Sequence, residues 1–206
     1  MILDSQIPKF LALNILTLTG LSVFGQNLSG LALTHALQHG GYVIVMRHGE
    51  SPMQPPSQGD ADSGNTKMER QLDGAGKASA KEMGDAIRDH HIPIGKVLSS
   101  PTFRALETVQ YTQLGHAETF AELGDNGMSM SGPSQAQTEW LRQRVGQFPS
   151  GSNTLIVTHN PNLVAAFADK AVGMKDGEAL VFGPGPDGKP ALMARIRIDE
   201  WKALPE

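Results

Sequence analysis

The chain has 206 residues, a length that suits one compact domain with or without a short leader. Hydrophobic residues make up 39% of the chain, which is enough for a packed core rather than a disordered chain. A formal net charge of -4 without a basic run argues against a nucleic-acid partner, and the absence of cysteine excludes disulfides, thiolate catalysis and cysteine-based zinc sites.

Residues 1–27 are predicted to be a leader, and residues 28–206 the single domain. The uncharged, mostly apolar run Phe10–Phe24 follows Lys9 and precedes several small residues, as in a signal peptide, and is short for a membrane span. We therefore expect a periplasmic or secreted protein that has no stable membrane span after cleavage. The alternatives are an uncleaved anchor or a buried N-terminal helix, and without a signal the protein is expected to be cytoplasmic.

Segments with the patterns of strands and helices alternate along the rest of the chain. Apolar runs bounded by turn residues predict strands over 42–46, 95–100, 153–159, 178–184 and 191–198. Helical spacing of apolar residues predicts helices over 28–39, 72–90 (with Asp73 as N-cap), 101–114, 134–148 and 160–172. Residues 115–133 are predicted to be irregular. This order implies an α/β fold, a three-layer αβα sandwich whose mostly parallel sheet carries an antiparallel C-terminal edge hairpin.

Cationic or titratable side chains follow three of the predicted strands. Arg47 and His48 end the first, His159 ends the third, and Arg104 lies in the first turn of the helix after the second. In an open parallel sheet the carboxyl ends of the strands lie along one edge, where ligands bind. These four side chains are therefore expected to converge although they are far apart in sequence.

Two helix starts are predicted at the same edge. Ser100 followed by Pro101, and Asn160 followed by Pro161, each resemble an N-cap followed by proline at the first helical position. Two helix N-termini would direct free N–H groups and positive dipole ends at one point. Because the planar guanidinium of arginine grips phosphate oxygens with two bonds, the combination predicts a pocket for a dianion.

Three motifs in this order resemble the histidine phosphatase superfamily, which has the phosphoglycerate-mutase-like fold. They are "RHG" at the end of a strand, "SSPTFRALET" in the middle of the chain and "VTHNPN" late in it. The tripeptide alone is a weak signal, but the three together are specific, and the resemblance extends from about Leu28 to Trp201. The resemblance is to the smaller branch of this superfamily, which lacks a large cap domain.

The resemblance implies a two-step reaction. His48 would attack phosphorus and become a phosphohistidine that water hydrolyses, with its other ring nitrogen donating to a fixed acceptor. Arg47, Arg104 and a protonated His159 would, with His48, hold the phosphoryl group. No metal ion or cofactor is expected.

The leaving group needs a proton, which the family usually takes from an acid after the arginine helix. In mutase-like members the acid falls two residues after a leucine, which indicates Asp125 after Leu123. Glu122 is the alternative. If neither reaches the site, the enzyme would favour substrates with good leaving groups.

The sequence therefore predicts a metal-independent phosphatase that acts on a small phosphorylated substrate. Two alternatives remain: a non-catalytic module that binds phosphate esters, suggested by the weak acid segment, and a phosphotransferase or mutase. The loop after Gly49 is expected to border the pocket. Arg70 is predicted to lie on the surface or behind the ligand-binding groups, and the pair His90–His91, at a helix end, to face solvent rather than a metal.

Overall fold

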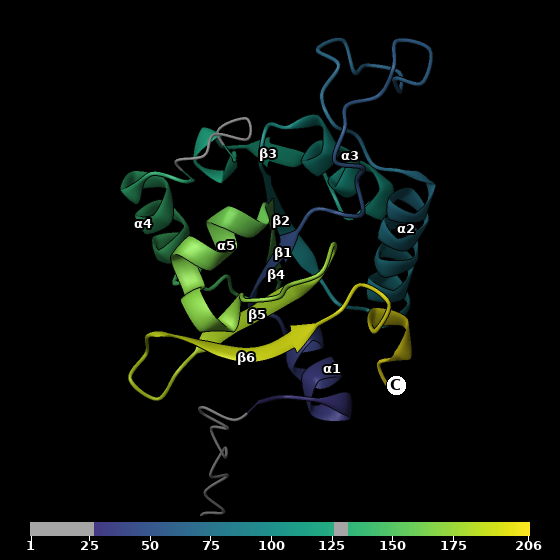
Figure 1. The fold of residues 1–206 in the computed structure, drawn as a ribbon. Coiled ribbons are helices and arrows are strands. Elements are labelled where there is room, and N and C mark those ends of the chain that lie inside the picture. The colour runs from purple at the N-terminus through teal and green to yellow at the C-terminus, as the bar shows by residue number, and fades with distance from the viewer. Residues whose placement is uncertain (1–26, 126–131) are drawn as a thin grey trace, which may run out of the picture.

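The computed structural model describes residues 27–125 and 132–206, so nearly all of the predicted leader lies outside the described residues. A six-stranded sheet forms the middle layer, in the order β3-β2-β4-β1-β5-β6 (Figure 1). The first four strands in this order run parallel, whereas β5 is antiparallel to both β1 and β6. The strands are β1 (Val43–Arg47), β2 (Ile94–Ser99), β3 (Ala117–Thr119), β4 (Asn153–Thr158), β5 (Ala179–Pro184) and β6 (Pro190–Ile196).

Helices cover both faces of this sheet (Figure 1). On one face lie α1 (Gly30–His39), α2 (Gly74–Asp89), α3 (Phe103–Thr112) and the 3-10 turn η3 (Trp201–Ala203). On the other lie α4 (Gln135–Arg144) and α5 (Asn160–Phe167). The 3-10 turn η1 (Ala121–Leu123) precedes α4 in the chain, and the 3-10 turn η2 (Ala168–Lys170) directly follows α5. The predicted αβα sandwich with its antiparallel edge hairpin is thus confirmed. Within the described ranges, no helix has the length and apolarity needed to cross a bilayer.

Strand β1 shows why a continuous apolar run marks the centre of such a sheet. Val43 and Val45 pack in the core under α4 and α5, whereas Ile44 and Met46 pack in the core under α1, α2 and α3. All four side chains are fully buried, because a central parallel strand has a helix layer on each side. The next residue, Arg47, is therefore the first of β1 to reach the edge of the core.

One strand falls in the stretch predicted to be irregular. Residues 117–119 form β3 and pair with β2, with Ala117 opposite Val97. The strand has only three residues and includes Glu118 and Thr119, so it lacks an apolar run and depends on its neighbour for its conformation. The remainder of the predicted irregular stretch includes residues 126–131, which lie outside the described part of the chain.

Both helix starts predicted at the sheet edge are displaced by one or two residues. Ser100, directly after β2, is still hydrogen-bonded to β4, because its backbone N–H donates to Val157 O, and α3 begins at Phe103 with Thr102 as its N-cap. Helix α5 begins at Asn160, so His159 rather than Asn160 is the N-cap. The predicted cap of α2 is confirmed, since the Asp73 side chain accepts from Gly76 N.

Candidate active site

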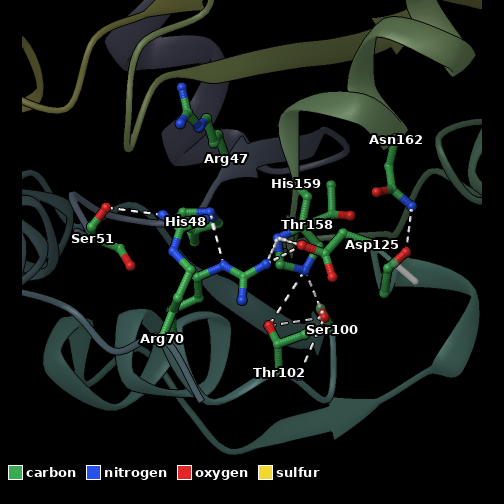
Figure 2. A network of polar contacts seen from close by, with 12 residues as sticks. Arg47, His48, Ser51, Arg70, Ser100, Thr102, Asp125, Thr158, His159 and Asn162 are labelled. Carbon is green, nitrogen blue, oxygen red and sulfur yellow. Dashed lines mark hydrogen bonds and ion pairs between the residues drawn. The ribbon is translucent and has the colours of Figure 1, made fainter. Parts of the chain in front are cut away.

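The ends of β1, β2 and β4 bring the four predicted side chains together. Figure 2 shows three of them, Arg47, His48 and His159. Arg47 lies opposite Thr158 in the parallel register of β1 and β4, so His48 and His159 both come directly after this paired position. Arg104 is the second residue of α3, which follows β2. The predicted convergence is therefore confirmed: all four side chains line one cavity of about 310 Å³.

His48 is held in one tautomer. Its side chain is buried, with 3% exposed, and its Nδ1 lies 2.8 Å from the carbonyl oxygen of Gly49. Because a carbonyl only accepts, Nδ1 carries the proton. Nε2 is therefore unprotonated, and it accepts from Arg104 Nε at 3.2 Å. The nitrogen with the free electron pair faces the cavity.

The surroundings of His48 keep this ring neutral. Burial lowers its pKa well below the ordinary value, and the positive charges of Arg104 and Arg47 add to this effect. The hydrogen bond to Gly49 O acts in the opposite direction without cancelling the shift. A neutral imidazole with a free electron pair is the form that a nucleophile requires.

His159 faces His48 across the cavity, with ring centroids 5.2 Å apart and an interplanar angle of 60°. Arg104 Nη2 lies 3.1 Å from His159 Nδ1, and the hydroxyl of Ser100 lies 2.8 Å from Nε2. An arginine only donates, so Nδ1 is unprotonated. Burial, followed by the charges of Arg104, Arg70 and Arg47, lowers the pKa of His159 to about 2. The geometry of the site therefore favours a neutral His159 and not the protonated form expected from the sequence.

Arg104 occupies the centre of the cluster and is itself buried. Its guanidinium donates to both imidazoles and forms an ion pair with the carboxylate of Asp125. Burial lowers the pKa of Arg104, and the charge of Asp125 raises it. An anion that binds here can replace the imidazoles as acceptors of these N–H groups.

Arg47 is fixed by contacts that the sequence did not suggest. Its Nη2 pairs with Asp176 Oδ1 at 2.5 Å, and its Nη1 donates to Met174 O at 3.2 Å. Its Nε is buried and has no hydrogen-bond partner among the described residues. A phosphoryl oxygen near this N–H would satisfy it.

The two candidate acids differ in position. Asp125 lines the cavity, and its carboxylate lies 3.8 Å from His159 Nδ1. Glu122 belongs to the 3-10 turn η1 and is absent from the lining of this cavity. Only Asp125, the first choice from the sequence, is thus brought to the imidazoles.

The prediction for Arg70 is wrong, because its side chain lines the cavity. Its Nε donates to Pro52 O at 2.6 Å and its Nη2 to Ser51 O at 2.9 Å, so it ties the loop after Gly49 to the site. Arg70 precedes a helix rather than ending a strand, so the rule that led to the other four side chains does not find it. The pair His90–His91 belongs to no potential metal site, and among the described residues no three His, Asp or Glu side chains form one.

Two further residues of the "SSPTFRALET" segment hold the loop between β1 and α2. Thr108 Oγ1 accepts from Gly49 N at 3.0 Å and donates to Arg104 O, and the Glu107 carboxylate accepts from Leu72 N at 2.7 Å. Burial is the main cause that raises the pKa of Glu107 to about 7. The helix that supplies Arg104 therefore also fixes both ends of the loop that follows His48.

A family model, described as the histidine phosphatase superfamily (branch 1), matches residues 43–125. The match runs from β1 to Asp125 and includes Arg47, His48 and Arg104 at the edge where the cavity lies. This segment of the chain is therefore similar to the histidine phosphatase superfamily. His159, which follows the matched segment, meets the matched residues in space.

Solved structures share the fold of this chain at low identity. The protein histidine phosphatase SixA complexed with tungstate has a TM-score of 0.55 and 18% identity, over 77% of this chain and 98% of that one. An Agrobacterium tumefaciens protein assigned as SixA has a TM-score of 0.53 and 18% identity, over 76% of this chain and 97% of that one. A mutant phosphoserine phosphatase from Entamoeba histolytica in complex with phosphoserine has a TM-score of 0.52 and 14% identity, over 75% of this chain and 95% of that one. No curated protein matches the chain.

A glycine of α2 lets the helix approach the loop that follows His48. A Cβ at Gly76 would lie 2.2 Å from the carbonyl oxygen of Glu50, whereas a Cβ at Gly74, in the same helical turn, meets nothing within 4 Å. Gly76→Ala is expected to destabilise the fold by about 1–3 kcal/mol and to lower kcat, because the loop after His48 must shift. Urea unfolding and steady-state kinetics measure both effects. Gly74→Ala is the matched control, and equal effects of the two changes would contradict the prediction.

The buried neutral His159 predicts a pH-dependent stability. Its folded pKa lies below the ordinary value of about 6.5, so the unfolded chain binds more protons below that pH and stability falls as the pH falls. Relative to wild type, His159→Gln is expected to gain stability below pH ~6.5, by up to about 1.4 kcal/mol per pH unit. Urea unfolding between pH 5 and 8 checks this, with the exposed His116→Gln as a control for loss of an imidazole elsewhere. A difference that does not vary with pH would refute it.

Proposed function

We propose that this protein is a metal-independent phosphatase that hydrolyses phosphomonoesters through a phosphohistidine on His48. The match of residues 43–125 to the histidine phosphatase superfamily supports phosphatase activity. The observation that carries the finer proposal is the tautomer of His48, whose Nδ1 donates to Gly49 O while Nε2 faces a cavity lined by three guanidiniums, those of Arg47, Arg70 and Arg104.

In the first step the phosphoryl group of the substrate enters the cavity and accepts N–H bonds from Arg104 in place of the two imidazoles. His48 Nε2 then attacks phosphorus, the new P–N bond forms and the P–O bond to the organic group breaks, with its electron pair leaving on that oxygen. Negative charge spreads over the phosphoryl oxygens in such a loose transition state. Arg47, Arg70 and Arg104 supply positive charge to it, so the proposed reaction needs no metal ion.

Asp125 is proposed as the proton donor to the leaving oxygen. A dianion that takes over Arg104 places negative charge next to this carboxylate, and like charges at close range favour protonation of one of them. In the second step Asp125 accepts a proton from water, the water oxygen attacks phosphorus and the P–N bond breaks. Inorganic phosphate leaves, and His48 Nε2 regains its electron pair.

Turnover of 4-nitrophenyl phosphate in the presence of a chelator tests the proposed reaction. Asp125→Asn should lower the hydrolysis of a simple alkyl phosphate by about 10²-fold or more, and that of 4-nitrophenyl phosphate far less, because a good leaving group needs little protonation. Phosphate binding without turnover of any ester would instead favour the binding module. Interconversion of phosphoglycerates would favour the mutase.

We also propose that residues 1–27 are an export signal and that residues 28–206 form the phosphatase domain. The support is the apolar run Phe10–Phe24 followed by small residues. Mass spectrometry of the mature N-terminus after expression in a bacterium tests this. A full-length chain recovered from the cytoplasm would contradict it.

A further inference from the structure

A second, larger cavity adjoins the phosphate pocket. It measures about 540 Å³, against about 310 Å³ for the pocket that holds the imidazoles. The two share Met53, Arg70, Arg104 and Asp125 as lining residues. The second cavity therefore opens beside the groups that would hold the phosphoryl group and protonate the leaving oxygen, where the organic part of a phosphate ester must lie.

The walls of the second cavity are mainly apolar. Met53 and Pro55 come from the loop after β1, Pro101 from the turn after β2 and Ala121 from η1. All four side chains are exposed, and Met53, with 68% of its surface accessible, is one of three exposed large hydrophobic residues in the described part of the chain. Apolar side chains gathered beside a polar catalytic pocket are typical of a site that binds the organic group of a ligand.

The charges of this cavity argue against a second anionic group on the substrate. Beyond the shared residues, Glu69 is its one ionisable lining residue, and it carries negative charge when ionised. The Glu69 carboxylate also accepts from Phe103 N at 2.9 Å, at the start of α3, so this helix terminus already has an acceptor. The cations of the cavity, Arg70 and Arg104, also line the phosphate pocket, so a carboxylate or second phosphate would have to share them with the phosphoryl group and would lie near Glu69.

The geometry points to a subsite for an uncharged, largely apolar leaving group, such as an aromatic ring, in the cavity lined by Met53, Pro55, Pro101 and Ala121. This inference rests on the proposed phosphatase function and adds the class of substrate. The space is sufficient, since a dry apolar cavity of about 150 Å³ is known to hold benzene. Esters of compact, doubly charged acids such as phosphoglycerate would gain nothing from it.

Phosphonates test the subsite without turnover, because their P–C bond is not hydrolysed. We would measure binding of methylphosphonate, benzylphosphonate and 3-phosphonopropionate to the full chain by calorimetry. Benzylphosphonate is expected to bind at least about tenfold more tightly than methylphosphonate, since a buried ring contributes more than 1.4 kcal/mol. 3-Phosphonopropionate is expected to bind no more tightly than methylphosphonate.

A substitution in the second cavity tests whether the affinity advantage of benzylphosphonate arises there. Ala121→Trp fills the second cavity from an exposed position and is expected to remove the advantage of benzylphosphonate while leaving methylphosphonate affinity unchanged. Ala203→Trp, at an exposed position of η3, is the matched control and should preserve the advantage. Equal affinities of the benzyl and methyl compounds in wild type, or an advantage that survives Ala121→Trp, would overturn the subsite. Binding of benzylphosphonate without turnover of any ester would overturn the proposed function but support the subsite.

Discussion

Replacing His48 with alanine is expected to lower kcat for 4-nitrophenyl phosphate by about 10⁴-fold or more. The change removes the neutral imidazole of the cavity whose Nδ1 donates to Gly49 O and whose Nε2 carries the free electron pair. The covalent step is lost with it. His48 contributes little to phosphate affinity compared with the arginines, because Nε2 is unprotonated and cannot donate to an oxygen. Affinity for inorganic phosphate should therefore change much less than kcat.

Rapid quenching in alkali separates loss of the nucleophile from general damage. Wild type mixed with a radiolabelled ester should retain label on the protein, because a P–N bond survives base and breaks in acid, and His48→Ala should retain none. His116→Ala, which removes an exposed imidazole from the same chain, should behave as wild type in both assays. Label retained by His48→Ala would assign the covalent step to another residue.

The sequence predicted the positions of the four convergent side chains because the strands that carry them are unmistakable. A central parallel strand is buried on both faces, so its apolar run ends where the core ends, and the first polar residues mark the edge of the sheet. His48 and His159 follow strands that pair in register, which places them side by side although 111 positions separate them. Convergence here follows from topology, which alternating strands and helices reveal.

The residues that the sequence did not predict are those whose positions depend on loops. Arg70 reaches the cavity through hydrogen bonds to the backbone of Ser51 and Pro52, and Asp176 meets Arg47 across 129 positions. No periodicity encodes such contacts. The sequence did not predict strand β3 for a related reason, since its conformation depends on pairing with β2 more than on its own residues.

The start of α3 differs from the prediction because of local hydrogen bonds. The sequence Ser100-Pro101 is typical of a helix start, but Ser100 remains hydrogen-bonded to β4, and its hydroxyl accepts from Thr102 N at 3.2 Å. The helix therefore begins at Phe103. The shift leaves Ser100 Oγ free to contact His159 Nε2, so the displaced boundary is itself part of the site.

Replacing Arg104 with lysine is expected to lower kcat/KM by about 10³-fold, the second largest effect of any single change in this cavity. Arg104 donates from Nε to His48 and from Nη2 to His159. A phosphoryl group would accept from these two donors in place of the imidazoles. A lysine keeps the charge but presents a single flexible point of donation, and it cannot reach both acceptors at once.

The result separates charge from geometry. If geometry dominates, Arg104→Lys should weaken inhibition by vanadate, which mimics the transferring phosphoryl group, by more than it weakens binding of inorganic phosphate. Gln110→Lys, which adds a lysine at an exposed position of the same helix, should leave both unchanged. Near-normal kcat/KM in Arg104→Lys would mean that the guanidinium serves only to balance the charge of Asp125, with which it pairs. In that case Arg47 and Arg70, the other two guanidiniums of the cavity, would have to hold the transition state.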